Sequence, residues 1–178
     1  MAASNDAAAA AAPELAAAAA APELTVSRLI DAPPELVFKV WTSQEHAARW
    51  WGPRGFTIVS CRLDARPGGA YRVVMRSPEG TIRTKRGVYR EILAPERLCF
   101  TYAWEDADGH PGHEMQITVT FQQQGDKTLV ILHQTGFESL VECDSHRDGW
   151  TGCFERCAKY IAALSESVPA DRLPVQEG

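Results

Sequence analysis

The sequence predicts an α+β domain in which a curved antiparallel sheet of six to seven strands wraps around a long C-terminal helix, with two short helices after the first strand. Three observations predict it. Apolar residues recur at helical spacing soon after a first strand, the next hundred residues alternate with a period of two, and helical spacing returns near the end. The strands are joined by short turns, so neighbouring strands are expected to be antiparallel.

The first unit is a strand followed by two short helices. Residues 24–30 alternate as a strand does, and the prolines of residues 31–34 mark a helix start, where a missing N–H is tolerated. Apolar residues then follow at helical spacing up to Trp41. Thr42 and Glu45 match a capping box, which predicts that the helix breaks and restarts there.

Six further strands follow, separated by turns rich in Gly, Pro and Asp. They are expected at residues 56–63, 70–76, 81–92, 97–104, 114–122 and 127–135. Within 114–121 apolar and polar residues alternate most clearly. One face of the sheet is therefore expected to be buried and the other exposed to water.

The last element is an amphipathic helix of about 18 residues, some 27 Å long at 1.5 Å per residue. Its apolar residues recur at steps of three and four, and they are Trp150, Cys153, Phe154, Cys157, Ile161 and Leu164. A helix of that length is expected to lie across the buried face of the sheet.

The folded domain is predicted to span residues 24–166. Residues 1–23 are almost entirely Ala, interrupted by prolines and without an apolar stripe, and are expected to be a disordered tail. Residues 167–178 are expected to be a flexible C-terminal tail.

Composition excludes several function classes. The formal net charge of −5 argues against a nucleic-acid binder, and no stretch after residue 24 approaches the ~18 apolar residues of a membrane span. The five Cys lack a CxxC pattern, and the first charged residue is acidic, unlike a secretory signal. We therefore expect a cytoplasmic protein with reduced thiols.

Seven short motifs occur in a defined order along the chain. They are Asp-Ala-Pro-Pro-Glu-Leu-Val-Phe at 31–38, Trp-Trp-Gly-Pro at 50–53, Asp-Ala-Arg-Pro-Gly-Gly at 64–69, Gly-Val-Tyr-Arg-Glu-Ile at 87–92, Pro-Glu-Arg-Leu at 95–98, Gln-Thr-Gly-Phe at 134–137 and Gly-Trp at 149–150. With them the chain resembles the START-like (SRPBCC) superfamily with the helix-grip fold, and within it the family similar to the C-terminal domain of the activator of Hsp90 ATPase.

The resemblance covers residues 24 to about 165. It implies a cavity between the sheet and the terminal helix that binds small hydrophobic or aromatic molecules. It also offers a second function, a chaperone-associated interaction module in the stress response, and a third, a cyclase- or hydrolase-like enzyme acting in the cavity.

The residues expected to face such a cavity are aromatic, aliphatic or sulfur-containing, as suits an apolar ligand. They are Trp41, Tyr71, Val73, Met75, Phe100, Tyr102, Trp104, Met115, Ile117, Val119, Trp150, Phe154 and Cys157. The alternative is that these side chains simply fill the core.

No catalytic, metal or cofactor site is predicted. Glu91 and His133 are the titratable residues whose strand parity would point them inward, and the alternative for both is a structural role. No nucleophile motif is present. His110 and His113 lie in a turn without a four-ligand set, so no native metal is expected.

Residues 60–90 carry eight basic residues against two acidic ones. Strand parity places Arg72 and Arg76 on the outer face of the sheet. This segment is either a solvated face or a docking surface for an acidic protein partner.

Overall fold

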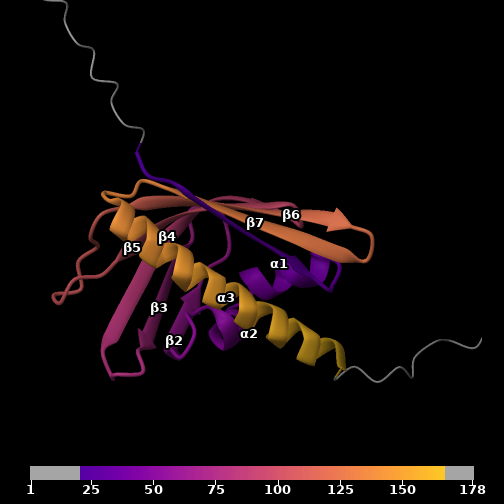
Figure 1. The fold of residues 1–178 in the computed structure, drawn as a ribbon, viewed down its shortest axis with the longest axis horizontal. Helices are drawn as coiled ribbons and strands as arrows, with labels where there is room; N and C mark the ends of the chain where they lie inside the picture. Colours follow the sequence, from indigo (N-terminus) through magenta and orange to yellow (C-terminus); the bar gives the residue numbers. More distant parts are fainter. Residues whose placement is uncertain (1–20, 167–178) are drawn as a thin grey trace, which may run out of the picture.

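The computed structural model describes residues 21–166, and it shows one seven-stranded sheet with three helices (Figure 1). The elements in chain order are β1 (Leu24–Ile30), α1 (Pro34–Thr42), α2 (Gln44–Trp50), β2 (Thr57–Leu63), β3 (Ala70–Arg76), β4 (Ile82–Leu93), β5 (Arg97–Trp104), β6 (Met115–Gln124), β7 (Lys127–Thr135) and α3 (Leu140–Glu166). The strand order is β1-β7-β6-β5-β4-β3-β2, and every neighbouring pair is antiparallel. The predicted fold class is confirmed.

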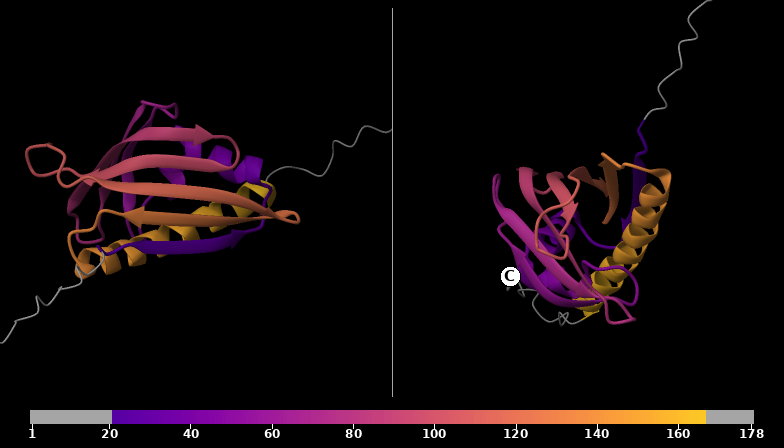
Figure 2. Two further views of the ribbon diagram at one scale, coloured as in Figure 1. Left: turned by 90° about the horizontal axis from the view of Figure 1, so that it is seen from above. Right: turned by 90° about the vertical axis from the view of Figure 1, so that its left-hand side faces the viewer.

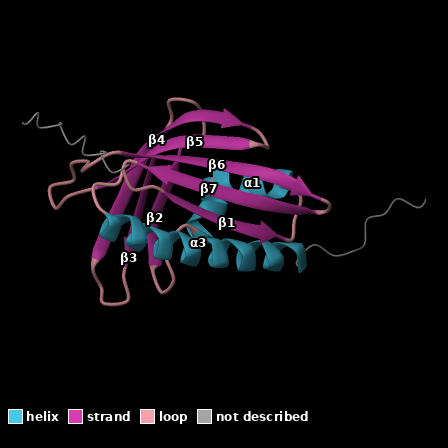
Figure 3. Ribbon diagram, turned by 45° about the horizontal axis from the view of Figure 1, so that its top comes forward, coloured by secondary structure: helices cyan, strands magenta, loops and turns pink. Residues whose placement is uncertain are grey.

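The sheet curls, and α3 lies along its open side (Figure 2). Seen from another angle, α3 runs beside the edge strand β1, and α1 lies behind the sheet (Figure 3). In β3, and in β6 as far as Phe121, every second residue is buried, as the alternation predicts. The buried face of the sheet thus meets α3 and the two short helices, while its other face is turned to water.

Strand bounds agree with the sequence to within two residues, but the start of α2 differs. Thr42 is the last residue of α1, and its hydroxyl donates to the Phe38 carbonyl oxygen at 2.9 Å. Ser43 is the N-terminal cap residue of α2 and makes no side-chain capping bond. The predicted capping box is wrong because the Thr42 hydroxyl bonds backward, within its own helix.

The C-terminal helix is longer than predicted, with 27 residues in place of about 18. Its first ten residues are mostly polar, and Leu140 and Val141 are exposed. Only Cys143 and His146 are buried in this stretch, so no apolar periodicity marks it. At 1.5 Å per residue α3 is about 40 Å long.

The predicted tails, residues 1–23 and 167–178, lie almost entirely outside the described residues. Within 21–166, no helix is both long and apolar enough to cross a membrane. All five cysteines are free thiols, as expected.

Candidate functional site

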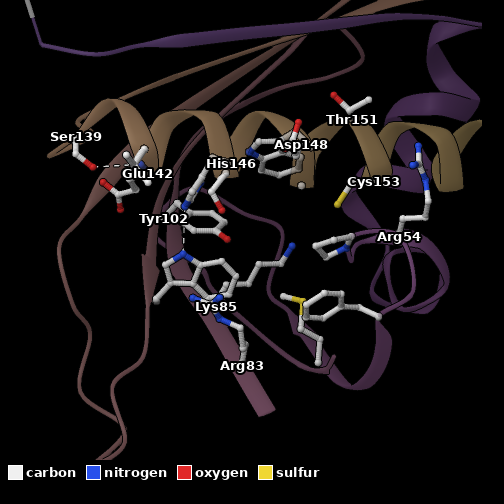
Figure 4. Close-up of a pocket in the computed structure, with 18 residues that line it drawn as sticks. Arg54, Arg83, Lys85, Tyr102, Ser139, Glu142, His146, Asp148, Thr151 and Cys153 are labelled. Atoms are coloured by element: carbon white, nitrogen blue, oxygen red, sulfur yellow. Dashed lines mark hydrogen bonds between the residues drawn. The ribbon is translucent and has the colours of Figure 1, made fainter. Parts of the chain in front are cut away.

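A cavity of about 800 Å³ lies between the buried face of the sheet and the first half of α3 (Figure 4). Strands β3, β4 and β5 form one wall, α3 forms the opposite wall, and the loop between α2 and β2 closes one end. The lining residues are Pro53, Arg54, Phe56, Met75, Arg83, Lys85, Tyr102, Trp104, Ser139, Val141, Glu142, Ser145, His146, Asp148, Gly149, Trp150, Thr151 and Cys153.

Lys85 is the most unusual residue of the cavity, because its charged side chain is only 2% exposed. Its Nζ donates a hydrogen bond to the backbone oxygen of Trp51 at 2.9 Å. The same atom lies 4.5 Å from the ring centre of Trp51 and 5.4 Å from that of Trp150. Two indole faces therefore stabilise this cation by cation–π contact.

Burial lowers the pKa of Lys85 from its ordinary value to about 8, since desolvation disfavours the ammonium form. Arg156 adds to that shift, whereas Cys153 and Cys61 would oppose it only as thiolates, at higher pH. Among residues 21–166, no carboxylate oxygen lies within 4.0 Å of Nζ. The ammonium is thus buried without a counter-ion from the described part of the chain.

A hydrogen-bonded network fixes two indoles on the two walls of the cavity, Trp104 on β5 and Trp150 on α3. Trp104 Nε1 donates to His146 Nε2 at 3.1 Å, and Trp150 Nε1 donates to Gln134 Oε1 at 2.8 Å. Because Nε2 accepts, the ring proton of the neutral imidazole is assigned to Nδ1. Nδ1 lies 3.4 Å from its acceptor, Gln134 Oε1, and 3.1 Å from Gln134 Nε2 of the same amide. Burial lowers the pKa of His146 to about 4. The imidazole is therefore neutral near pH 7, and both indoles are held in place.

The mouth of the cavity carries charges of both signs. Arg54 Nη2 lies 2.5 Å from Glu155 Oε2, and the Arg83 guanidinium lies 4.5 Å from the ring centre of Trp104. On α3, Glu142 accepts a hydrogen bond from the backbone N–H of Glu138 at 3.0 Å. The mouth is polar, whereas the deeper walls are largely aromatic.

Comparison with known proteins assigns the family. The model of the "Activator of Hsp90 ATPase homolog 1-like protein" family matches residues 31–162, which include every strand from β2 to β7. The chain belongs to this family. The match extends across both walls of the cavity, from the α2–β2 loop to α3.

Solved structures of this Hsp90 ATPase activator-like fold resemble the chain over most of its length. A protein from Chromobacterium violaceum is 25% identical, with 77% of this chain and 94% of that chain covered and a TM-score of 0.70. The AHSA1 protein from Silicibacter pomeroyi is 25% identical, with coverages of 80% and 99% and a TM-score of 0.75. A protein from Arthrobacter aurescens, at 24% identity, coverages of 88% and 92% and a TM-score of 0.68, shares the fold. No curated protein matches.

Four of the thirteen residues expected to face a ligand line this cavity: Met75, Tyr102, Trp104 and Trp150. The other nine are buried in the core and do not line it. They are Trp41, Tyr71, Val73, Phe100, Met115, Ile117, Val119, Phe154 and Cys157. Strand parity indicates which face of the sheet is buried. It does not indicate where along α3 side chains fill the space against that face and where a cavity remains. Ligand contact by these residues stays a prediction.

Sequence reasoning missed Lys85, His146 and Gln134. Lys85 shares its strand parity with Tyr89, which is buried, and that parity was a usable signal. This signal was overlooked because Lys85 lies in a run of basic residues, and such runs are typical of an exposed surface. His146 lies in the part of α3 that has no apolar periodicity, so nothing in the sequence marked it.

Of the two alternatives for Glu91 and His133, the inward orientation is wrong. A β-bulge between Tyr89 and Glu91 shifts the register of β4, so the side-chain alternation changes there. The Glu91 carboxylate is 45% exposed and lies 3.6 Å from Arg97. His133 lies on the outer face of β7 and pairs with Glu23 at 3.2 Å.

The outer face of β3 is less basic than the sequence suggests. Arg72 and Arg76 are exposed, as predicted. Arg72, however, donates two hydrogen bonds to the Glu105 carboxylate, at 2.7 and 2.6 Å, and Arg86 lies 3.6 Å from the same carboxylate. This geometry lowers the pKa of Glu105 and keeps it ionised. The pairing neutralises part of the proposed docking surface.

One group among the described residues brings three metal-ligand types together. Oxygens of Asp106 and Asp108 and a ring nitrogen of His110 lie within 4.8 Å of one another, and all three residues are exposed. Asp106 Oδ1 already accepts hydrogen bonds from the backbone N–H groups of Asp108 and His110, at 3.0 and 2.8 Å. The cluster is accounted for by the turn that it stabilises.

Proposed function

We propose that the protein binds a small hydrophobic or aromatic molecule in the cavity between the sheet and α3. The observation that carries the proposal is the cavity itself. Its volume of about 800 Å³ lies within the range of roughly 300–1,000 Å³ that small-molecule sites occupy. Phe56, Tyr102 and Trp150 line it, and flat aromatic walls give a ligand a large contact area at low entropic cost.

Binding without catalysis is the function that the lining groups support. Burial raises the pKa of Cys153, so this residue is a neutral thiol rather than a thiolate nucleophile. His146 has both ring nitrogens engaged and its pKa lowered, so its imidazole is not available as a general base. We place the protein in the cytoplasm on the same reasoning, because five unpaired thiols suit a reducing compartment.

The family match supports a second candidate, a chaperone-associated module with a role in the stress response. The surface that such a module would offer to an acidic protein is the outer face carrying Arg72 and Arg76. Because Glu105 already binds Arg72, this face attracts an acidic partner less strongly than its sequence suggests. We therefore rank the cavity first.

Filling the cavity tests the proposal. Gly149 lies inside α3 and lines the cavity, and a Cβ added there would meet only Pro53, at 3.8 Å. Gly149→Leu therefore adds a side chain at the cavity wall where its Cβ meets no clash, and it gains helix propensity. The probe is N-phenyl-1-naphthylamine, a neutral aromatic dye whose fluorescence rises in apolar sites.

We expect the dye to bind the wild type at one site, and Gly149→Leu to weaken its affinity at least about tenfold, as a loss of ~1.4 kcal/mol would. Lys159→Leu, an exposed change on the same helix, is the matched control and should leave the affinity unchanged. Equal dye affinity in all three proteins would reject the cavity as the binding site.

A further inference from the structure

We infer that the ligand of this cavity is an organic anion, an aromatic acid whose anionic oxygens are received by Lys85 and Tyr102. The inference rests on the proposed function and names the class of ligand. It depends on two hydrogen-bond donors that the described chain leaves unused at the cavity surface.

The first unused donor is the Lys85 ammonium. An ammonium group has three N–H donors, and only Trp51 accepts from this one among the described residues. Lys85 is also nine-tenths or more buried, and Figure 4 shows its amino end reaching into the space between the sheet and α3. Two N–H groups are thus free to bind an acceptor that enters the cavity.

The second unused donor is the Tyr102 hydroxyl. Its residue is buried and lines the cavity, yet the hydroxyl forms no hydrogen bond with any residue of the described part of the chain. The Tyr102 hydroxyl oxygen is not fully enclosed by protein, whereas the Tyr89 hydroxyl, which also lacks a partner among the described residues, is. Burial raises the pKa of Tyr102, so its proton stays in place as a donor.

The charges around Lys85 favour an anion rather than a neutral acceptor. Burial raises the pKa of Cys61, on β2, to about 11, and also that of Cys153, on α3, so both thiols are neutral near pH 7. Arg156, also on α3, is a cation and donates to the backbone oxygens of the α2–β2 loop. Glu142 and Asp148 line the α3 wall but form no ion pair with Lys85.

A buried cation without a counter-ion is unfavourable, and a bound anion would relieve it. Charge-assisted hydrogen bonds to an anionic oxygen are about twice as strong as neutral ones. The aromatic body of the ligand would then pack against Phe56, Met75 and Trp150. A carboxylate and a sulfonate share this chemistry, and the experiment distinguishes them.

Two dyes that differ by one anionic group provide the test. 1-Anilinonaphthalene-8-sulfonate is N-phenyl-1-naphthylamine with an added sulfonate. Both are titrated into the full chain at pH 7, and each variant is judged by its effect on one dye relative to the other. This ratio cancels the difference in hydrophobicity between the dyes.

We expect Lys85→Met and Lys85→Gln to weaken sulfonate-dye binding at least about tenfold and neutral-dye binding less than about twofold. Lys85→Gln keeps a donor for the Trp51 oxygen, so it separates loss of charge from loss of that hydrogen bond. Tyr102→Phe should weaken only the sulfonate dye, by a few fold. Lys127→Met, which removes an exposed lysine paired with Asp31, is the matched control and should change neither.

A second arm uses competition by 2-naphthoate and 2-naphthamide against the neutral dye. If the naphthoate competes more strongly than the naphthamide, and this difference disappears in Lys85→Met, the site also accepts carboxylates. Equal competition would restrict the site to sulfonates. If the Lys85 variants weaken both dyes equally, the anion site is overturned while the cavity stands. If Gly149→Leu affects neither dye, the proposed function fails as well.

Discussion

The two ends of the groove between the sheet and α3 are built differently. At the end near α1, Trp41 contacts Trp50, Phe121, Trp150 and Phe154 at ring distances of 4.7–6.4 Å. At the other end, Lys85 and the His146 network border a cavity of about 800 Å³. The same sheet face and the same helix thus carry a filled core at one end and an open site at the other.

The difference teaches which residues stabilise the fold and which are available for function. Close aromatic packing contributes to stability through buried area and ring contacts. A buried ammonium and an unfilled volume contribute nothing comparable, and both reduce stability. Mutations at the two ends should therefore change different measurable properties.

The largest effect is expected at the filled end. Trp41→Ala removes a side chain that is 2% exposed and packed among four rings, and should lower the free energy of unfolding by about 3–5 kcal/mol. Trp104→Ala, at the cavity, should lower it by only about 1 kcal/mol, because its ring is partly exposed and borders empty space. Urea denaturation of both variants checks this, and equal losses would remove the distinction between the ends.

A smaller effect follows from His146. Its pKa is lowered to about 4 in the folded state, so the unfolded chain binds the proton first as pH falls. Stability should then fall between about pH 6.5 and 4, with a loss of about 2 kcal/mol between pH 7 and 5 from this residue. His146→Gln should be less sensitive to acid over that window. Parallel pH profiles of the two proteins would refute the assignment.

The smallest effect concerns Lys85 and is expected at alkaline rather than acid pH. Because burial lowers its pKa to about 8, the unfolded chain holds this proton up to higher pH than the folded chain. The free energy of unfolding should therefore increase by about 1 kcal/mol between pH 7 and 9, as Lys85 in the folded chain loses its proton. Lys85→Met should lack this increment when thermal unfolding is compared at both pH values, and an identical increment in the variant would contradict the burial of the charge.

The fold could be predicted from the sequence because the alternation of apolar and polar residues and the turn residues are local signals. The alternation in β6 and the turns between strands are determined by neighbours in the chain, so the strand bounds could be predicted to within two residues. The family resemblance then correctly implied the helix-grip arrangement. The first ten residues of α3 were missed because their buried positions include a polar residue, His146.

The site itself was only partly predictable. Parity indicated correctly that Met75 and Tyr102 face inward, but the filled and open ends of the groove differ through contacts between distant residues, such as Trp41 with Trp150. The bulge after Tyr89 reversed the alternation that would have placed Glu91 inside. Lys85 shows the same limit: strand parity could place it on the buried face, but its enclosure by two indoles depends on Trp51 and Trp150, which are distant in the chain.

The most direct measurement is NMR of the full chain labelled with ¹³C-lysine, in which the Cε resonance of Lys85, assigned with Lys85→Met, is titrated with pH. We expect Lys85 to titrate near pH 8 in the free protein. Its pKa should rise by about one unit or more with 1-anilinonaphthalene-8-sulfonate bound, and stay unchanged with N-phenyl-1-naphthylamine. A Lys85 resonance that titrates near pH 10.4, the ordinary value for lysine, and responds to neither dye would contradict both the buried charge and the anion site.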